Sequence, residues 1–427
     1  MSRFTPLDWL RKRGVLDRVR SFHRDESGVI TLLTVFVMLG CTWMLLWLFN
    51  SAKQLDSKVR MQNAVDAAGQ SGVGVLARGM NAVAFANRFE ADLIAAVAVM
   101  QGTQSTPAAS SPMIGVLLPT FQEILAGQSG QLPPDRPIPA FRRSIVTQIP
   151  MLADEVTRNV GRANGLWRGV NAANNPNGPQ GSLLVQLWTT SGQAIGHGSE
   201  DDPHTRTLPL IDPSPLGLDA QYLGDSGGLL QQARQEREQL VRHYIAIWAR
   251  DLAAGDPALA SRLISQAEIP LQVLLNDLYS KSNLPLLLRS PATDRQTLER
   301  DLMFVSVAYR RHSISSASRM FRNPNAAIAP AMAFAQLHLF LPRPRYICCP
   351  WGETRIDPRT GESYFISYTD GWPTDWSAHT QNWQAKLVPA TARSLSAILS
   401  QSVPGTNANP PHWGQLTPRQ FDELTHH

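Results

Sequence analysis

The sequence predicts an α+β protein whose N-terminal transmembrane helix continues into a long helix, and three patterns lead to this fold class. An uncharged apolar run covers residues 29–49. Residues 51–100 contain no proline and keep the spacing of an α-helix. After Pro342 the sequence becomes richer in aromatic and β-branched residues, which favour strands. We therefore expect a mainly helical region outside the membrane, followed by a small C-terminal β-sheet.

The run at residues 29–49 has the length of a membrane span. It carries no charge, and a helix of this length extends about 31 Å, close to the ~30 Å hydrocarbon thickness of a bilayer. A buried core helix is disfavoured because bulky apolar side chains occur on every face. A cleavable signal is disfavoured because the run continues to Phe49, beyond the usual length of about 7–15 residues. Lipid modification of Cys41 is disfavoured because this residue lies in the middle of the run.

The charges on either side of the run predict its orientation. Seven basic side chains precede it, and three follow it within the next 28 residues: Arg3, Arg11, Lys12, Arg13, Arg18, Arg20 and Arg24 against Lys53, Lys58 and Arg60. By the positive-inside rule, the N-terminus is cytoplasmic and most of the chain lies outside the cytoplasm.

The predicted organisation has five parts. They are a cytoplasmic basic segment (1–28), the transmembrane helix (29–49), a juxtamembrane long helix (50–100), a mainly helical extracytoplasmic region (101–341) and a β-rich C-terminal region (342–427). Helices are expected in the fourth part at 117–126, 140–162, 229–252, 257–279, 297–311 and 326–341. In the fifth part, an Asp-Pro-Arg-Thr-Gly turn at 357–361 predicts a β-hairpin.

The composition excludes several classes of protein. The chain has 427 residues, of which 43% are apolar, and this is too apolar for a disordered protein. Its net charge of +5 comes from basic and acidic residues spread along the whole length, so nucleic-acid binding is not expected. The three cysteines contain no CxxC pair for zinc and cannot form the disulfide framework of a small secreted domain. We predict no metal and no cofactor.

Small residues recur every three or four positions in the juxtamembrane helix and form one narrow stripe, which we call the helix-packing seam: Ala64, Ala67, Ala68, Ser71, Gly72 and Val75. Small side chains let another helix approach closely. The sequence leaves two neighbours open for this seam, a partner protein and the outer domain of the same chain. Further along, Asn81 and Asn87 are expected to form structural hydrogen bonds with a neighbouring element.

Two short motifs resemble the N-terminal segment of the TadE/TadG-like proteins. The first is Arg-Asp-Glu-Ser-Gly at 24–28, just before the apolar run, and the second is Arg-Met-Gln-Asn-Ala-Val-Asp-Ala-Ala at 60–68. Residues 382–391 are also similar to a closing segment of long TadG-like proteins. Members of this family accompany tight-adherence (Flp) pilus machines and related type II secretion systems in bacteria. The resemblance implies an accessory protein of the inner membrane that acts by binding.

The chain departs from the family pattern in two places. Pilin-like substrates of prepilin peptidase usually carry glutamate five residues after the cleavage glycine, and Leu33 stands there if Gly28 is that glycine. We therefore expect Gly28 to remain uncleaved and the chain to resemble the TadG branch. Some TadG proteins carry a metal site with a DxSxS sequence, which this chain lacks, so the family's metal-dependent adhesion is not expected here.

Three further motifs were weighed as sites. Residues 224–228 (Gly-Asp-Ser-Gly-Gly) match a serine-protease signature, but they stand before a strong helix and are better explained as a helix cap. Residues 197–204 hold two histidines and three carboxylates without metal-ligand spacing, which favours a solvated acidic loop. Cys348 and Cys349 are adjacent, which leaves open a vicinal disulfide, bonds to a second chain, or two thiols. We predict no catalytic residues.

These patterns together predict a single-pass membrane protein that helps to assemble a Tad/Flp pilus or a related secretion apparatus. Its expected partners are the lipid bilayer and proteins of that machinery, with self-association as a further alternative. The competing hypothesis from another class is a membrane-anchored extracytoplasmic hydrolase.

Overall fold

The computed structural model describes the following residues: 26–104, 112–126, 136–164, 183–189, 208, 210–211, 226–280, 286–288, 302–310, 331–341, 353–356, 363–366, 379 and 381–389. The chain divides into two compact units, Met1–Arg60 with His312–Ala329, and Met61–Arg311 with Pro330–His427. In these regions the protein is mostly helical, with a small antiparallel sheet and one apolar N-terminal helix.

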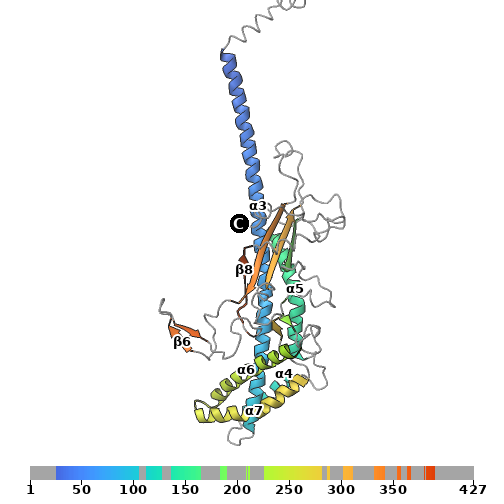
Figure 1. Cartoon of the computed structure of the whole chain (residues 1–427), viewed down its shortest axis with the longest axis vertical. Coiled ribbons are helices and arrows are strands. Elements are labelled where there is room, and N and C mark those ends of the chain that lie inside the picture. The colour runs from blue at the N-terminus through green and yellow to red at the C-terminus, as the bar shows by residue number, and fades with distance from the viewer. Residues whose placement is uncertain are drawn as a thin grey trace, which may run out of the picture. The chain divides into compact units, whose positions relative to one another are not determined.

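Helix α3 is the longest element and contributes to both units. It runs from Glu26 to Gln104 without interruption (Figure 1). The predicted long helix at residues 50–100 is therefore confirmed, and it forms one helix with the apolar run. The first unit contains the N-terminal part of α3, where residues 30–49 are exposed and mostly apolar.

The second unit is built around a four-stranded antiparallel sheet. Its strand order is β1 (Leu183–Thr189), β4 (Met303–Arg310), β5 (Ala331–Phe340) and β8 (Gln384–Val388). In the register, Val307 of β4 lies opposite both Gln186 of β1 and Phe334 of β5. Four distant parts of the chain thus form one sheet.

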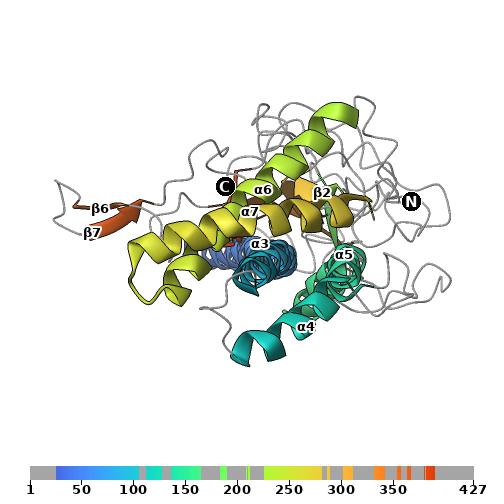
Figure 2. The ribbon, with the colours of Figure 1, turned by 90° about the horizontal axis from the view of Figure 1, so that it is seen from below.

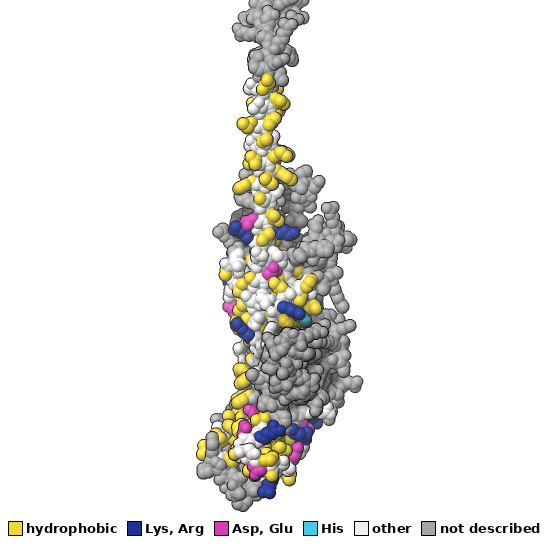
Figure 3. Space-filling view, turned by 90° about the vertical axis from the view of Figure 1, so that its left-hand side faces the viewer, with side chains coloured by type: hydrophobic (Ala, Val, Ile, Leu, Met, Phe, Trp, Pro, Cys, Tyr) yellow, Lys and Arg dark blue, Asp and Glu magenta, His cyan; other side chains and the backbone are white. Residues whose placement is uncertain are grey.

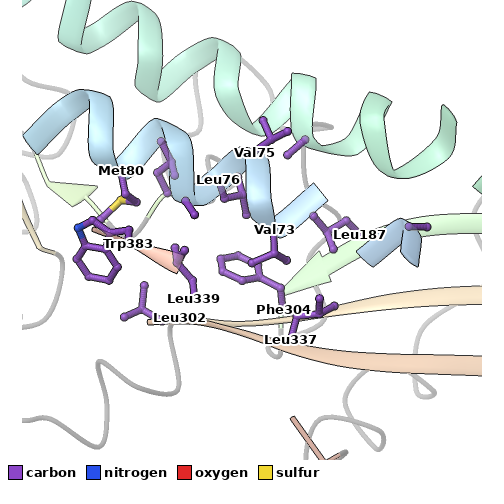
Figure 4. Packing of buried hydrophobic residues seen from close by; sticks show 14 of the residues in the cluster. Val73, Val75, Leu76, Met80, Leu187, Leu302, Phe304, Leu337, Leu339 and Trp383 are labelled. Atoms are coloured by element: carbon purple, nitrogen blue, oxygen red, sulfur yellow. The ribbon is translucent and has the colours of Figure 1, made fainter. Parts of the chain in front are cut away.

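Helix α3 packs across one face of this sheet. Figure 4 shows Val73, Leu76 and Met80 of α3 next to side chains from the sheet and from Trp383. Phe304, Leu337 and Leu339 are all fully buried in this cluster. Helix α5 (Pro137–Ala163) packs against β1 and contributes Ile145 and Ala153 to the same core.

A second core surrounds the C-terminal part of α3. It contains Ala86, Ala91 and residues 93–100 of α3 together with side chains of α4 (Pro112–Ala126), α6 (Ser226–Leu252) and α7 (Pro257–Ser280). Seen from below in Figure 2, α6 and α7 lie side by side on one side of this end of α3, and α4 and α5 lie on another. The predicted helices at 117–126, 140–162, 229–252 and 257–279 are thereby confirmed, and Pro270 lies inside α7.

Two predicted helices are wrong. Residues 297–311 and 326–341 were expected to be helical, but they contain strands β4 and β5. Both faces of these central strands are buried: Phe304 and Leu337 face α3, while Val305, Val307 and Phe334 point the other way and are buried as well. A strand buried on both faces lacks the alternation of polar and apolar residues, so its sequence resembles that of a buried helix.

The sheet is also not confined to the C-terminal region. Three of its four strands come before residue 342, and only β8 lies in the region 342–427 that was expected to be β-rich. That region does contain the predicted hairpin, formed by β6 (Glu353–Ile356) and β7 (Ser363–Ile366). A further two-stranded pair joins β2 (Leu210–Ile211) to β3 (Leu287–Leu288).

Candidate functional site on helix α3

Amide side chains of α3 bind the backbone of the sheet at its β8 side. Gln62 Nε2 donates to Phe334 O (2.8 Å), and Gln70 Nε2 donates to Ala385 O (2.8 Å). Asn81 accepts hydrogen bonds from the backbone N–H groups of Asn382 and Trp383, and its Nδ2 donates to Trp383 O (3.1 Å). These contacts satisfy backbone groups at the edge of the sheet, where no further strand pairs among the described residues. The expected structural role of Asn81 is confirmed.

Glycines on α3 mark the places where other elements approach most closely. A Cβ atom added at Gly72 would overlap Thr157 Oγ1 of α5 and lie 3.1 Å from Ala153 O. At Gly69 it would lie 2.6 Å from Leu337 Cδ1 of the sheet, and at Gly102 it would lie 2.9 Å from the backbone oxygen of Gln266 in α7. In contrast, nothing lies within 4 Å of a Cβ added at Gly74.

The helix-packing seam contacts other elements of the second unit. Ala64, Ala68, Gly72 and Val75 are buried, and three of them belong to the core cluster formed with the sheet. Ala67 and Ser71 are half-buried at the margin of this contact. Of the two neighbours that the sequence left open, the same chain occupies the buried part of the seam, through the sheet and α5.

A buried ionic cluster connects α3 to α5 and α6. Glu90 accepts hydrogen bonds from Arg142 Nη1 (2.7 Å) and from Arg237 Nη2, and all three side chains are at most 3% exposed. Asn87, one turn before Glu90, accepts from Arg142 (3.0 Å) and donates to Leu286 O (3.2 Å). The expected structural role of Asn87 is confirmed as well. One carboxylate thus faces two guanidinium groups in a region from which water is excluded.

Three groups with shifted pKa values lie where α3, α6 and α7 meet. Trp248 Nε1 of α6 donates to Asp92 Oδ1 of α3 (2.8 Å); burial raises the pKa of Asp92, and this hydrogen bond partly offsets the rise. Burial and the nearby Arg88 and Arg250 lower the pKa of His243 to about 4. Burial also raises the pKa of Tyr279 to about 12, and its hydroxyl donates to Arg234 O (3.4 Å). The hydrogen bonds of Asp92 and Tyr279 connect α6 to α3 and to α7.

Sequence reasoning missed the ionic cluster. The only signal in α3 was Glu90, a charged residue next to the apolar residues Phe89 and Ala91, and the two arginines lie 52 and 147 residues away in the sequence. Neither the spacing nor the composition of those segments distinguishes Arg142 and Arg237 from solvated arginines.

The N-terminal part of α3 has the surface of a lipid-facing helix. Residues Ile30–Phe49 form the one stretch in the described chain that is long and apolar enough to cross a membrane. Hydrophobic side chains cover its surface in Figure 3. Its hydroxyl groups bond within the helix, since Thr34 donates to Ile30 O (2.8 Å) and Thr42 donates to Met38 O (2.7 Å). Cys41 and Leu33 are exposed on this stretch.

Several predicted sites fall outside the described residues. Cys348, Cys349 and the acidic loop at 197–204 are among them. Of the Gly-Asp-Ser-Gly-Gly motif, Ser226 is the first residue of α6, in agreement with a position at a helix start. Within the described ranges, no group of three or more His, Cys, Asp or Glu side chains could hold a metal ion.

The chain matches no protein-family model, no curated protein and no solved structure.

Proposed function

We propose that this protein is a single-pass protein of the bacterial inner membrane that acts by binding, as an accessory or minor component in the assembly of a Tad/Flp pilus or a related type II secretion apparatus. Its N-terminus is cytoplasmic, and its second unit lies outside the cytoplasm. The observation that carries the proposal is the exposed apolar stretch of α3 at residues 30–49.

This stretch is suited to lipid and costly in water. Burying one large aliphatic or aromatic side chain is worth about 1.5–3 kcal/mol, and residues 30–49 expose more than a dozen such side chains. The internal hydrogen bonds of Thr34 and Thr42 remove the need for a polar partner in the hydrocarbon. The basic residues before the helix support a cytoplasmic N-terminus.

The assembly role rests on the resemblance of residues 24–28 and 60–68 to TadE/TadG-like proteins. The second motif has a physical role in this chain: Gln62 binds the sheet backbone, and Ala64 and Ala68 are buried against the same sheet. The residues of this second motif are therefore those with which α3 begins to contact the sheet. This supports a common architecture of one anchor helix with a domain mounted on it.

Reporter fusions test the anchor and its orientation. A reporter that is active only outside the cytoplasm should be active when fused after Leu341 and silent when fused before Gly28. The opposite pattern would refute the proposed location.

Deletion of the gene tests the role in assembly. We expect loss of pili or of secretion, restored by the full chain. Normal piliation and secretion in the deletion strain would refute the assembly role, and loss of a hydrolytic activity instead would favour the membrane-anchored hydrolase.

A further inference from the structure

One face of α3 in the second unit carries an exposed pair of phenylalanines. Phe85 is 57% exposed and Phe89 is 39% exposed. Their rings stack with centroids 6.0 Å apart and planes inclined by 7°, so together they form one continuous apolar surface. Contiguous exposed apolar side chains mark interaction surfaces more often than isolated ones do.

Two arginines on the same helix flank this pair. Arg78 is exposed and lies two turns before Phe85, and Arg88 lies one turn after it. The Nε atom of Arg88 is buried and has no hydrogen-bond partner within the described parts of the chain. We call Arg78, Phe85, Arg88 and Phe89 the aromatic–arginine face.

The surroundings of this face are electropositive. The two nearest carboxylates along the helix are both engaged: Glu90 with Arg142 and Arg237, and Asp92 with Trp248. Across the contact with α6, Arg88 and Arg250 both disfavour the charged form of His243. A partner that brings carboxylates would therefore gain attraction here, and one that brings cations would be repelled.

We propose that the aromatic–arginine face docks an acidic amphipathic helix of a partner protein. This inference rests on the proposed binding function and names the chemistry of its partner. Phenylalanine and arginine are enriched at protein interfaces. Segments that bind anionic lipid carry clusters of about four to eight Lys or Arg, and membrane interfaces are enriched in tryptophan and tyrosine, whereas this face has two arginines and neither of those aromatic residues. A second copy of this chain would bring two sets of arginines together and is disfavoured by their repulsion.

Peptide binding to the full chain in detergent micelles tests the proposal. The probe is a fluorescent amphipathic peptide of about 20 residues with leucines on one face and glutamates beside them, and the control peptide has lysine at every glutamate position. The acidic peptide should bind, and the lysine peptide should not. The double variant Phe85→Ser/Phe89→Ser should weaken binding of the acidic peptide about tenfold or more.

Helix α7 offers a matched control for this variant. Ile269 and Val273 are 77% and 64% exposed and also lie four residues apart on one helix. Ile269→Ser/Val273→Ser should leave the affinity within about twofold. The single variant Arg78→Glu changes only an exposed side chain, so it keeps the test valid if the phenylalanine variant unfolds. It should weaken the acidic peptide and strengthen the lysine peptide.

Four results would overturn the proposal: equal binding of both peptides, equal loss in the α7 control, binding to anionic vesicles that requires Phe85 and Phe89, or self-association that requires them. Failure of peptide binding in a chain that still supports piliation would refute this face and leave the proposed function standing. If the acidic peptide binds through this face but deletion of the gene changes neither piliation nor secretion, the proposed function is refuted and the docking face stands.

Discussion

Replacing Glu90 with glutamine should destabilise the second unit more than any surface charge change. The substitution keeps the size of the side chain and removes its charge, so Arg142 and Arg237 each lose the carboxylate that they share while remaining buried. Breaking a buried ion pair by removing one partner typically costs about 3–5 kcal/mol. Because Glu90 serves two arginines, we expect a loss toward the upper end of this range.

Urea unfolding of the full chain in micelles, followed by circular dichroism, measures this loss. Glu268→Gln is the matched control, since Glu268 pairs with Arg242 at 3.3 Å with both side chains nearly half exposed. Such a surface pair contributes about 0–1 kcal/mol. The triple variant Glu90→Met/Arg142→Met/Arg237→Met should recover most of the stability, because apolar replacement of a whole buried ion cluster is often neutral. A Glu90→Gln variant as stable as Glu268→Gln would refute the reasoning.

Three further predictions follow from the geometry of α3 and its neighbours. Ala68→Leu/Gly72→Leu should make the outer domain protease-sensitive, because overpacking at each site costs about 1–3 kcal/mol of stability, whereas Gly74→Leu adds a side chain in open space and should leave the domain resistant. Equal protease resistance in both variants would show that the seam is not packed as described. Because the pKa of His243 is lowered to about 4, the unfolded chain binds more protons than the folded chain between about pH 6.5 and 4, and the free energy of unfolding should fall as the pH drops through this window. His243→Gln should reduce this fall, measured as the shift of the urea midpoint with pH, and an unchanged pH dependence in the variant would contradict the prediction. Mass spectrometry of the purified protein should find the peptide before Gly28 still attached, because Leu33 stands at the glutamate position of pilins. A mature N-terminus at Val29 would refute this prediction and place the chain with the pilins.

Local patterns allowed much of the helical part of the fold to be predicted from the sequence. The long helix lacks proline, and α6 has a clear apolar face next to a charged one, so each could be recognised within its own residues. Strands β4 and β5 could not be recognised, because burial on both faces removes the alternation that reveals a strand. The pairing of strands is harder still to predict from sequence. Among the described residues, β8 joins the sheet through β5 alone, and nothing in the sequence of Gln384–Val388 indicates that neighbour.

The same limit applies to the functional residues. A seam of small residues predicts close approach of another element, but sequence does not say whether that element belongs to the same chain. For the buried side of α3 the structure shows that the approaching elements belong to the same chain, because Thr157 lies beside Gly72 and Leu337 lies beside Gly69.

The position of the seam also restricts where a partner can bind on α3. Residues that lie opposite Ala68 and Gly72 on the helix include Gly74, Arg78 and Phe85, and these are the positions left open or exposed. Small residues on one face therefore fix the outer domain to the helix, and larger residues on the other face remain available for binding. Substitutions can separate the two roles: changes at Gly72 should affect folding first, and changes at Phe85 or Arg78 should affect binding in a domain that remains folded.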